Sequence, residues 1–319
     1  MILVTGATGL VGSQICRLLK EKSIEFRALK RETSKIPSEL IDENWFTADI
    51  LDYGAMLEAM EGVTTIIHAA AMISFYHKDN KQMELINVQG TNTVINAALK
   101  SSVTRILHIS SIAALGRSKS DIEINENTQW TYSQNNTYYS ETKYLAELEV
   151  WRGLEEGLSV TVVNPSIILG IGDWTTSSTR LFKYAFDEHR FFPSGSMNYV
   201  DNRDVASLVI ALINSPSGER YILNGGNVSY ENFFSIAALS FGKKPPVKKI
   251  SKNTSMFILV VAKIQSILTG RRPFVTREAL LSSKKNYQYD ASKIKKLMNF
   301  AFRDFEDTVA WVCAGLKKD

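Results

Sequence analysis

The chain has 319 residues, 45% of them hydrophobic, and a formal net charge of +4. This composition excludes a disordered or repetitive chain, and the length suffices for one large domain or one domain with a small lobe. The chain starts on an apolar run with no basic segment before it, so the sequence predicts no secretory signal. We expect Cys16 and Cys313, the two cysteines, to be core residues of a reduced, cytoplasmic protein.

Positive charge is concentrated in the C-terminal part of the chain. Residues 243–303 contain 15 Lys or Arg residues against two acids, Glu278 and Asp290, so the remainder is net negative. This local excess favours an anionic ligand or surface, and a solvated basic face is the alternative. The sequence leaves open whether these charges meet lipid, the phosphates of a CoA ester or only water.

A glycine-rich turn lies at the start of the chain. Residues 1–4 are typical of a buried strand, and apolar residues recur at helical spacing over 10–19, so the glycines fall in a strand-to-helix turn. Such a turn brings backbone N–H groups and the positive end of a helix dipole to a phosphate. The G-x-x-G-x-x-G spacing differs from the commonest dinucleotide fingerprint, and a plain glycine-rich turn is the alternative. We assign six residues to the cofactor phosphates: Gly6, Thr8, Gly9, Leu10, Val11 and Gly12.

A second strand, predicted over residues 24–29, runs into Lys30 and Arg31. In dinucleotide-binding folds an acid at this position accepts from the ribose 2′-OH of NAD, whereas an arginine accommodates the 2′-phosphate of NADP. Arg31 therefore favours NADP(H). Glu32 leaves NAD(H) as an alternative, because a shift of one residue would supply the acid, and two solvated basic residues are the simplest explanation.

A very apolar fourth strand is predicted over residues 64–68, and its composition indicates burial on both faces. The small residues Ala69 and Ala70 follow it and leave room for a flat cofactor. We expect His68 to be packed rather than catalytic. Phe75, on the next loop, is predicted either to line the substrate pocket or to cover the core.

Strands and helices alternate along this part of the chain. Helical patterns at 51–60 and 80–99 separate predicted strands at 45–48, 64–68 and 105–109. This alternation predicts right-handed βαβ units and a parallel sheet, in which ligands bind beyond the carboxyl ends of the strands. We therefore predict an α/β fold, a Rossmann-type doubly wound parallel sheet with a smaller C-terminal substrate lobe.

The same pattern suggests a division of the chain. The dinucleotide-binding domain is predicted to span residues 1–169, with a strand and helix returning at about 196–224. The substrate lobe is predicted to comprise residues 170–195 and 225–319.

Tyr139 and Lys143 open another predicted helix and lie on one face of it, about one turn apart. An isolated tyrosine has a pKa near 10, and a nearby ammonium lowers that value by favouring the phenolate. A tyrosine tuned in this way can exchange a proton with a carbonyl or alcohol while hydride moves. Ser111, at the end of the 105–109 strand, is placed to hydrogen-bond the same oxygen.

These residues resemble the extended short-chain dehydrogenase/reductases, the family of NAD-dependent epimerases and dehydratases. The resemblance extends over nearly the whole chain. The motifs that carry it are the glycine turn, Asp49-Ile50, His68-Ala69-Ala70, Asn87 to Thr91, Ser110-Ser111, Tyr139 to Lys143, Asn164-Pro165 and Tyr199 to Ala206.

The resemblance implies a role for each matching residue. Tyr139 is implied to be the catalytic acid/base, Lys143 to bind the nicotinamide ribose and lower the tyrosine pKa, and Ser111 to position the substrate oxygen. Asp49 and Ile50 resemble the pair that contacts adenine. Pro165 resembles the strand-end proline beside the nicotinamide. We also assign Ala69 and Ala70 to the cofactor, and Phe75, Ser111 and Asn164 to the substrate. Asn87 often has a structural role in such enzymes.

The segment 163–170 resembles dihydroflavonol and cinnamoyl-CoA reductases and 3β-hydroxysteroid dehydrogenases. Nucleotide-sugar dehydratases carry an Asp-Glu pair where this chain has Ile112-Ala113, which disfavours dehydration. We therefore predict an NAD(P)-dependent oxidoreductase that interconverts a carbonyl and an alcohol on a partly apolar substrate. The alternatives are a nucleotide-sugar epimerase with tightly bound NAD and a non-catalytic dinucleotide-binding sensor.

An apolar helix is predicted at 255–268, too short and too interrupted by Lys263 to span a bilayer. It is interpreted as core or pocket lid, or as a surface helix that contacts anionic lipid peripherally and admits an apolar substrate. We predict a small-molecule substrate, no nucleic-acid partner and no metal site. The resemblance also suggests a homodimer formed by the helices at 80–99 and 139–154.

Overall fold

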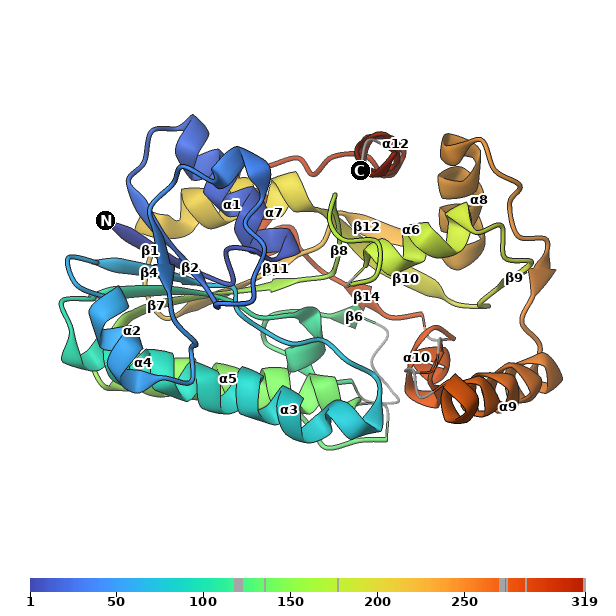
Figure 1. Ribbon diagram of the computed structural model, residues 1–319, viewed down its shortest axis with the longest axis horizontal. Coiled ribbons are helices and arrows are strands. Elements are labelled where there is room, and N and C mark those ends of the chain that lie inside the picture. Colours follow the sequence, from blue (N-terminus) through green and yellow to red (C-terminus); the bar gives the residue numbers. More distant parts are fainter. Residues whose placement is uncertain are drawn as a thin grey trace.

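A seven-stranded parallel sheet forms the larger part of the molecule (Figure 1). The computed structural model describes residues 1–117, 123–134, 136–176, 178–269, 273, 275–284 and 286–317. The strand order is β11-β7-β5-β4-β1-β2-β3, and every neighbouring pair is parallel. The predicted doubly wound fold is confirmed. The strands are β1 (Ile2–Thr5), β2 (Phe26–Lys30), β3 (Trp45–Thr47), β4 (Thr65–His68), β5 (Arg105–Ile109), β7 (Ser159–Pro165) and β11 (Glu219–Leu223).

Helices cover both faces of this sheet because its strands are apolar on both sides. On one face lie α1 (Leu10–Glu21) and α7 (Asn202–Ala211). On the other lie α2 (Tyr53–Ala59), α4 (Gly90–Lys100) and α5 (Tyr138–Glu155). Short 3-10 turns occur at Ser38–Leu40, His77–Asp79, Ile112–Leu115 and Leu212–Asn214.

The helix predicted over 80–99 contains a π-helical turn. It comprises α3 (Asn80–Glu84), the π turn Leu85–Gln89 and α4. The buried Asn87 lies in this turn; its amide oxygen accepts from Met72 N at 2.7 Å, and its amide nitrogen donates to Thr142 Oγ1 at 3.0 Å. Asn87 thus connects the segment after β4 to α5. This is the structural role that the resemblance suggested for it.

A smaller lobe extends from one end of the sheet (Figure 1). Its centre is a three-stranded sheet of order β12-β10-β8 packed against an aromatic core. The elements of this lobe are β8 (Ile167–Leu169), α6 (Thr179–Phe186), β9 (Phe191–Phe192), β10 (Ser196–Asp201), β12 (Gly226–Ser229), α8 (Tyr230–Phe241), β13 (Lys248–Lys249), α9 (Lys252–Thr269), α10 (Arg277–Ser282) and α12 (Phe305–Leu316). Within the lobe β9 pairs with β13. The pair β14 (Gln288–Tyr289) with β6 (Glu123–Ile124) and the helix α11 (Ser292–Met298) pack instead in the core of the large sheet.

The division predicted from the sequence stays a prediction, and the structure adds a detail that bears on it. Residues of β8 and β10 fall within segments predicted for the larger domain, yet they pair with each other and with β12. Val200 packs in the core of the large sheet, whereas Tyr199 packs in the core of the lobe. These strands therefore join the two cores.

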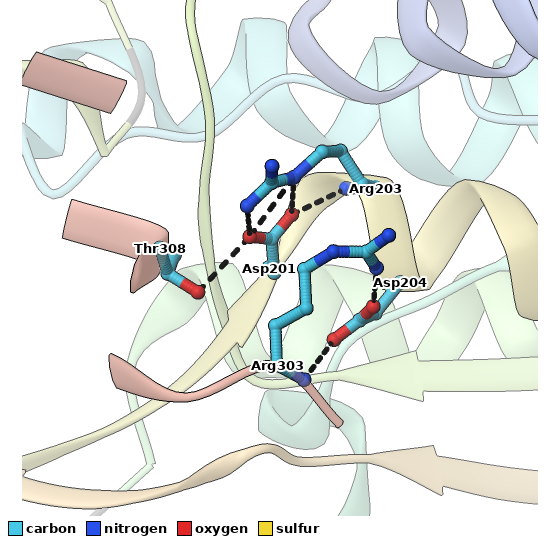
Figure 2. A network of polar contacts seen from close by, with 5 residues as sticks. All are labelled: Asp201, Arg203, Asp204, Arg303 and Thr308. Atoms are coloured by element: carbon cyan, nitrogen blue, oxygen red, sulfur yellow. Dashed lines mark hydrogen bonds and ion pairs between the residues drawn. The ribbon is translucent and has the colours of Figure 1, made fainter. Parts of the chain in front are cut away.

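A polar network fastens the last part of the chain to the start of α7 (Figure 2). Buried Asp201 accepts from Arg203 Nη2 at 2.6 Å and from Thr308 Oγ1 at 2.9 Å. Buried Asp204 accepts from the backbone N of Arg303 at 2.8 Å and from its guanidinium. Two carboxylates next to one helix start thus hold both the 303 segment and α12.

Candidate active site

The glycine turn packs so tightly that two of its positions, Gly6 and Gly12, leave no room for a side chain. Gly6 has φ +66°, and a Cβ there would lie 2.7 Å from the backbone N of Ala70. A Cβ on Gly12 would lie 2.2 Å from Gly6 O. Gly9 caps α1 without a side-chain hydrogen bond to the first N–H groups. The first turn of this helix therefore presents N–H groups to an anion, and the cradle fits the pyrophosphate of a dinucleotide.

The residues predicted to contact the adenosine half lie at the same edge of the sheet. Arg31 is exposed directly after β2, and Asp49 is exposed just after the neighbouring β3. Asp49 Oδ1 accepts from Leu51 N at 3.0 Å, which fixes the turn there. Ile50 is buried, and a Cβ on Gly90 would lie 2.5 Å from its Cδ1. The structure brings these residues together, and their contacts to a cofactor remain predictions.

His68 is a packed residue, as predicted. Its ring hydrogen-bonds Thr5 Oγ1 at 2.7 Å and Thr91 Oγ1 at 3.1 Å. Complete burial lowers the pKa of His68 to about 3, and the charge of Lys143 adds to this. The imidazole is therefore neutral at physiological pH and holds β1 and β4 to α4.

Ser111, Tyr139 and Lys143 come from neighbouring elements of the sheet's carboxyl edge. Ser111 follows β5, and the other two lie on the first turns of α5. Thr137 and Ser140 form a capping box, with Ser140 N donating to Thr137 Oγ1 at 3.1 Å. This box fixes the start of α5, so that the side chain of Tyr139 meets that of Ser111.

The sequence-based expectation of a lowered tyrosine pKa is wrong for this structure. Burial raises the pKa of Tyr139 to about 12, while the hydrogen bond from Ser111 and the charge of Arg117 act in the opposite direction. Desolvation outweighs these effects because it disfavours the phenolate. Tyr139 thus keeps its proton at neutral pH, which is the form that donates to a carbonyl oxygen.

Lys143 is almost completely buried, at 1% exposure. Its Nζ donates to Ile109 O at 3.0 Å. Burial lowers the pKa of Lys143 to about 8, and the charge of Glu147 raises it in opposition. The ammonium therefore titrates close to physiological pH.

Glu147 is a residue of this site that the motif comparison missed. It lies four residues after Lys143, at the spacing that relates Lys143 to Tyr139, and is also 1% exposed. Its carboxylate accepts from Asn164 Nδ2 at 2.5 Å and from Arg220 Nη2 at 2.8 Å. The i, i+4, i+8 spacing was the signal in the sequence that could have found it.

Asn164 lies beneath the site, and its predicted contact with substrate remains a prediction. Its side chain is fully buried, and its amide nitrogen donates to Ser111 O at 3.0 Å as well as to Glu147. This asparagine lies on β7, whose next residue, the buried Pro165, ends the strand. Asn164 therefore supports the residues beneath the site.

Apolar and aromatic side chains surround the tyrosine. The half-buried Phe75 lies edge-on to Tyr139, with ring centroids 6.3 Å apart. Met83 and Ala113 pack against the tyrosine, and Met72 lies beside them. Phe75 thus packs beside the ring of Tyr139, whereas its contact with substrate remains a prediction.

A carboxylate from the lobe reaches the start of the same helix. Glu278 Oε1, on α10, accepts from the backbone N of Tyr138 at 2.9 Å. Partial burial raises the pKa of Glu278, and this backbone hydrogen bond acts against the rise. The lobe is thereby attached next to Tyr139.

Comparisons with known proteins identify the family of the chain. A model of the NAD dependent epimerase/dehydratase family matches residues 2–224. Sterol demethylase protein B of Methylococcus capsulatus is 32% identical over 230 residues, 70% of this chain and 69% of the relative. Cinnamoyl-CoA reductase 1 of Petunia hybrida is 29% identical over 241 residues, 70% of this chain and 72% of the relative.

Solved structures share the fold over the whole chain. The crystal structure of gox2253 superposes with a TM-score of 0.84 at 32% identity, covering 100% of this chain and 98% of that one. UDP-glucose 4-epimerase of Thermotoga maritima, solved with UDP-glucose, gives a TM-score of 0.79 at 16% identity, covering 99% and 98%. At that identity the second likeness shows the fold alone. Separately, none of the helices among the described residues is long and apolar enough to cross a membrane.

Proposed function

Because the chain belongs to the NAD dependent epimerase/dehydratase family, we propose that it is an NADP(H)-dependent oxidoreductase that interconverts a carbonyl and an alcohol on a partly apolar substrate. The observation that carries the proposal is the buried Tyr139, which meets Ser111 and packs among apolar side chains. A protonated tyrosine in such a setting is suited to reduce a carbonyl on an apolar body.

The residues at the sheet edge divide the work between binding and proton transfer. The Gly6, Thr8, Gly9, Leu10, Val11 and Gly12 turn holds the pyrophosphate. Arg31 pairs with the 2′-phosphate, Asp49 and Ile50 contact adenine, and Ala69, Ala70 and Pro165 border the nicotinamide. A bound nicotinamide dinucleotide supplies or accepts the hydride.

Proton transfer is assigned to the residues around Tyr139. Ser111 and Tyr139 both hydrogen-bond the carbonyl oxygen, and Tyr139 donates its proton as the alcohol forms. Lys143 holds the nicotinamide ribose, and its positive charge stabilises the phenolate that the transfer leaves behind. In the oxidation direction the same tyrosine accepts the proton.

A nucleotide-sugar epimerase is the second candidate, because UDP-glucose 4-epimerase shares this fold over nearly the whole chain. An epimerase of this type retains NAD and shows no net redox turnover. The exposed Arg31 and the apolar surroundings of Tyr139 favour the reductase. A dinucleotide sensor has no use for the Ser111, Tyr139 and Lys143 arrangement.

Net cofactor consumption decides between these functions. We expect purified protein to consume NADPH, followed by absorbance, with a member of a panel of aldehydes, ketones and CoA esters. The same protein incubated with UDP-glucose should give no UDP-galactose. Epimerisation without net change in cofactor, by protein that purifies with NAD bound, would overturn the proposal.

We further propose a cytoplasmic homodimer that pairs through the α3, α4 and α5 face. Leu148 on α5 and Leu85 on the π turn between α3 and α4 are 44% and 42% exposed, which suits an apolar contact with a second copy. Cys16 and Cys313 are both free and buried, in keeping with a reducing compartment. Light scattering should give a dimer mass that Leu148→Glu converts to a monomer mass.

A further inference from the structure

Helix α9 presents a stripe of apolar side chains to the outside. Met256, Val260 and Ile264 are 68%, 51% and 51% exposed, whereas Ser255 and Ala262 are buried at 6% and 1%. The exposed residues are four positions apart, so they form one stripe along the helix. A surface helix in water normally has the opposite arrangement, with its polar residues outward. We therefore expect another molecule to cover this stripe.

Positive charge is concentrated in the part of the sequence that contains the stripe, and the described lysines precede α9. Residues 243–277 contain nine Lys or Arg residues and no acid. Lys244, Lys248 and Lys249 are exposed on the segment that leads into α9, together with Val247, at 71% exposure. The exposed Arg190 lies beside them, its carbonyl accepting from Lys248 N at 2.9 Å. We name the stripe and these basic residues the α9 surface.

The combination of charge and apolar area selects the occupant. A second copy of the chain would bring one basic segment against another, which is repulsive. The phosphates of a soluble ligand would pair with the lysines and leave the stripe in water. An anionic bilayer uses both, because lysines attract its headgroups and apolar side chains enter the boundary with the acyl chains. We propose that the α9 surface binds an anionic phospholipid bilayer, with α9 lying in the plane of the interface.

The α9 surface is connected to the start of the catalytic helix. Lys284 Nζ donates to Ser255 Oγ of α9 at 3.0 Å, just after α10 ends. Within α10, Glu278 accepts from the backbone N of Tyr138. Figure 1 shows α9 and α10 next to each other, at the end of the molecule opposite α2 and the N-terminus. A bilayer bound at α9 therefore lies near the end of the site that contains Tyr139. The bilayer would supply an apolar substrate to that end, a step that rests on the proposed function.

Vesicle co-sedimentation tests the lipid-binding step directly. The full chain should sediment with vesicles of phosphatidylcholine mixed with phosphatidylglycerol, more weakly at high salt, and remain soluble with phosphatidylcholine alone. Val260→Glu and Ile264→Glu should each lower the bound fraction. Lys248→Glu with Lys249→Glu should lower the partition coefficient at least about twentyfold, since each lysine near an anionic surface contributes a factor of about five.

Ile41→Glu is the matched control, because Ile41 is 62% exposed and lies after the turn at Ser38–Leu40, outside the lobe. It should bind vesicles as the natural chain does. Equal losses in Val260→Glu and Ile41→Glu, or no binding to anionic vesicles, would overturn the proposal. A change of oligomeric state in Val260→Glu without vesicle binding would overturn it in favour of a second copy. Tyr139→Phe should lose turnover but bind vesicles as the natural chain does. Vesicle binding therefore tests the lipid proposal separately from the proposed catalytic function.

Discussion

The sheet edge and the α9 surface use charge in opposite ways. At the sheet edge Lys143 and Glu147 are each 1% exposed, and each has a hydrogen-bond partner. At the α9 surface Lys248 and Lys249 lie in water beside exposed apolar side chains. A buried charge acts strongly on its immediate neighbours because little solvent screens it, whereas exposed charges act together on an extended surface. The first arrangement suits chemistry and the second suits adhesion.

Removing the hydroxyl of Tyr139 should have the largest effect. Tyr139→Phe should lower kcat/KM about 100-fold to 10,000-fold, the usual contribution of a positioned acid/base. The dissociation constant for NADPH should stay nearly unchanged, since the glycine turn and Arg31 are intact. Steady-state kinetics and a binding titration check both statements, and retained turnover would remove Tyr139 from the mechanism.

The second largest effect is expected on stability, from the Asp201–Asp204 network that attaches the lobe. Arg303→Ala removes the cation that faces buried Asp204 (Figure 2). We expect unfolding free energy to fall by about 2–3 kcal/mol, below the value for a fully buried pair because Arg303 is partly exposed. Denaturant unfolding measures the loss.

Lys293→Ala provides the control for that measurement. Its ion pair with Glu219 is exposed on both sides, so the loss should stay under about 1 kcal/mol. Equal losses in the two variants would show that burial at Asp204 does not decide the strength of the attachment.

Glu147→Gln should shift the pH profile. Burial already lowers the pKa of Lys143 to about 8, and Glu147 opposes that lowering. Without the carboxylate the pKa should fall further, so the ammonium is lost at lower pH and kcat/KM declines earlier on the alkaline side. A change of one pKa unit gives about a tenfold loss on that limb.

Glu149→Gln is the matched control on the same helix, because the half-buried Glu149 pairs with Arg152 and Asn92 rather than with Lys143. Its alkaline limb should coincide with that of the natural chain. Coincident profiles for Glu147→Gln and Glu149→Gln would show that Glu147 does not act on Lys143.

Arg31→Ala should have the smallest effect. NADPH affinity should fall about fivefold, the upper range for an exposed ion pair, while NADH affinity stays the same. Fluorescence titration with both cofactors measures this difference. A loss in Glu32→Ala confined to NADH would instead assign Glu32 to the ribose 2′-OH.

The elements that could be predicted from the sequence are those with local signals. They are the Gly6 turn, the apolar strands and the Tyr139–Lys143 spacing, each of which depends on residues close together in the chain. In the structure each of these features lies at the predicted residues. The pKa of Tyr139 and the burial of Asn164 depend on how α5 packs against β5 and β7, which spacing does not report. The apolar pattern of residues 255–268 predicted a helix but not which of its faces points outward.

The central claim is tested most directly by titrating purified protein with NADPH and with NADH and following nicotinamide fluorescence. The account predicts protein that purifies without cofactor and binds NADPH more tightly than NADH. Protein that arrives with NAD already bound, or that prefers NADH, would contradict it and favour the epimerase.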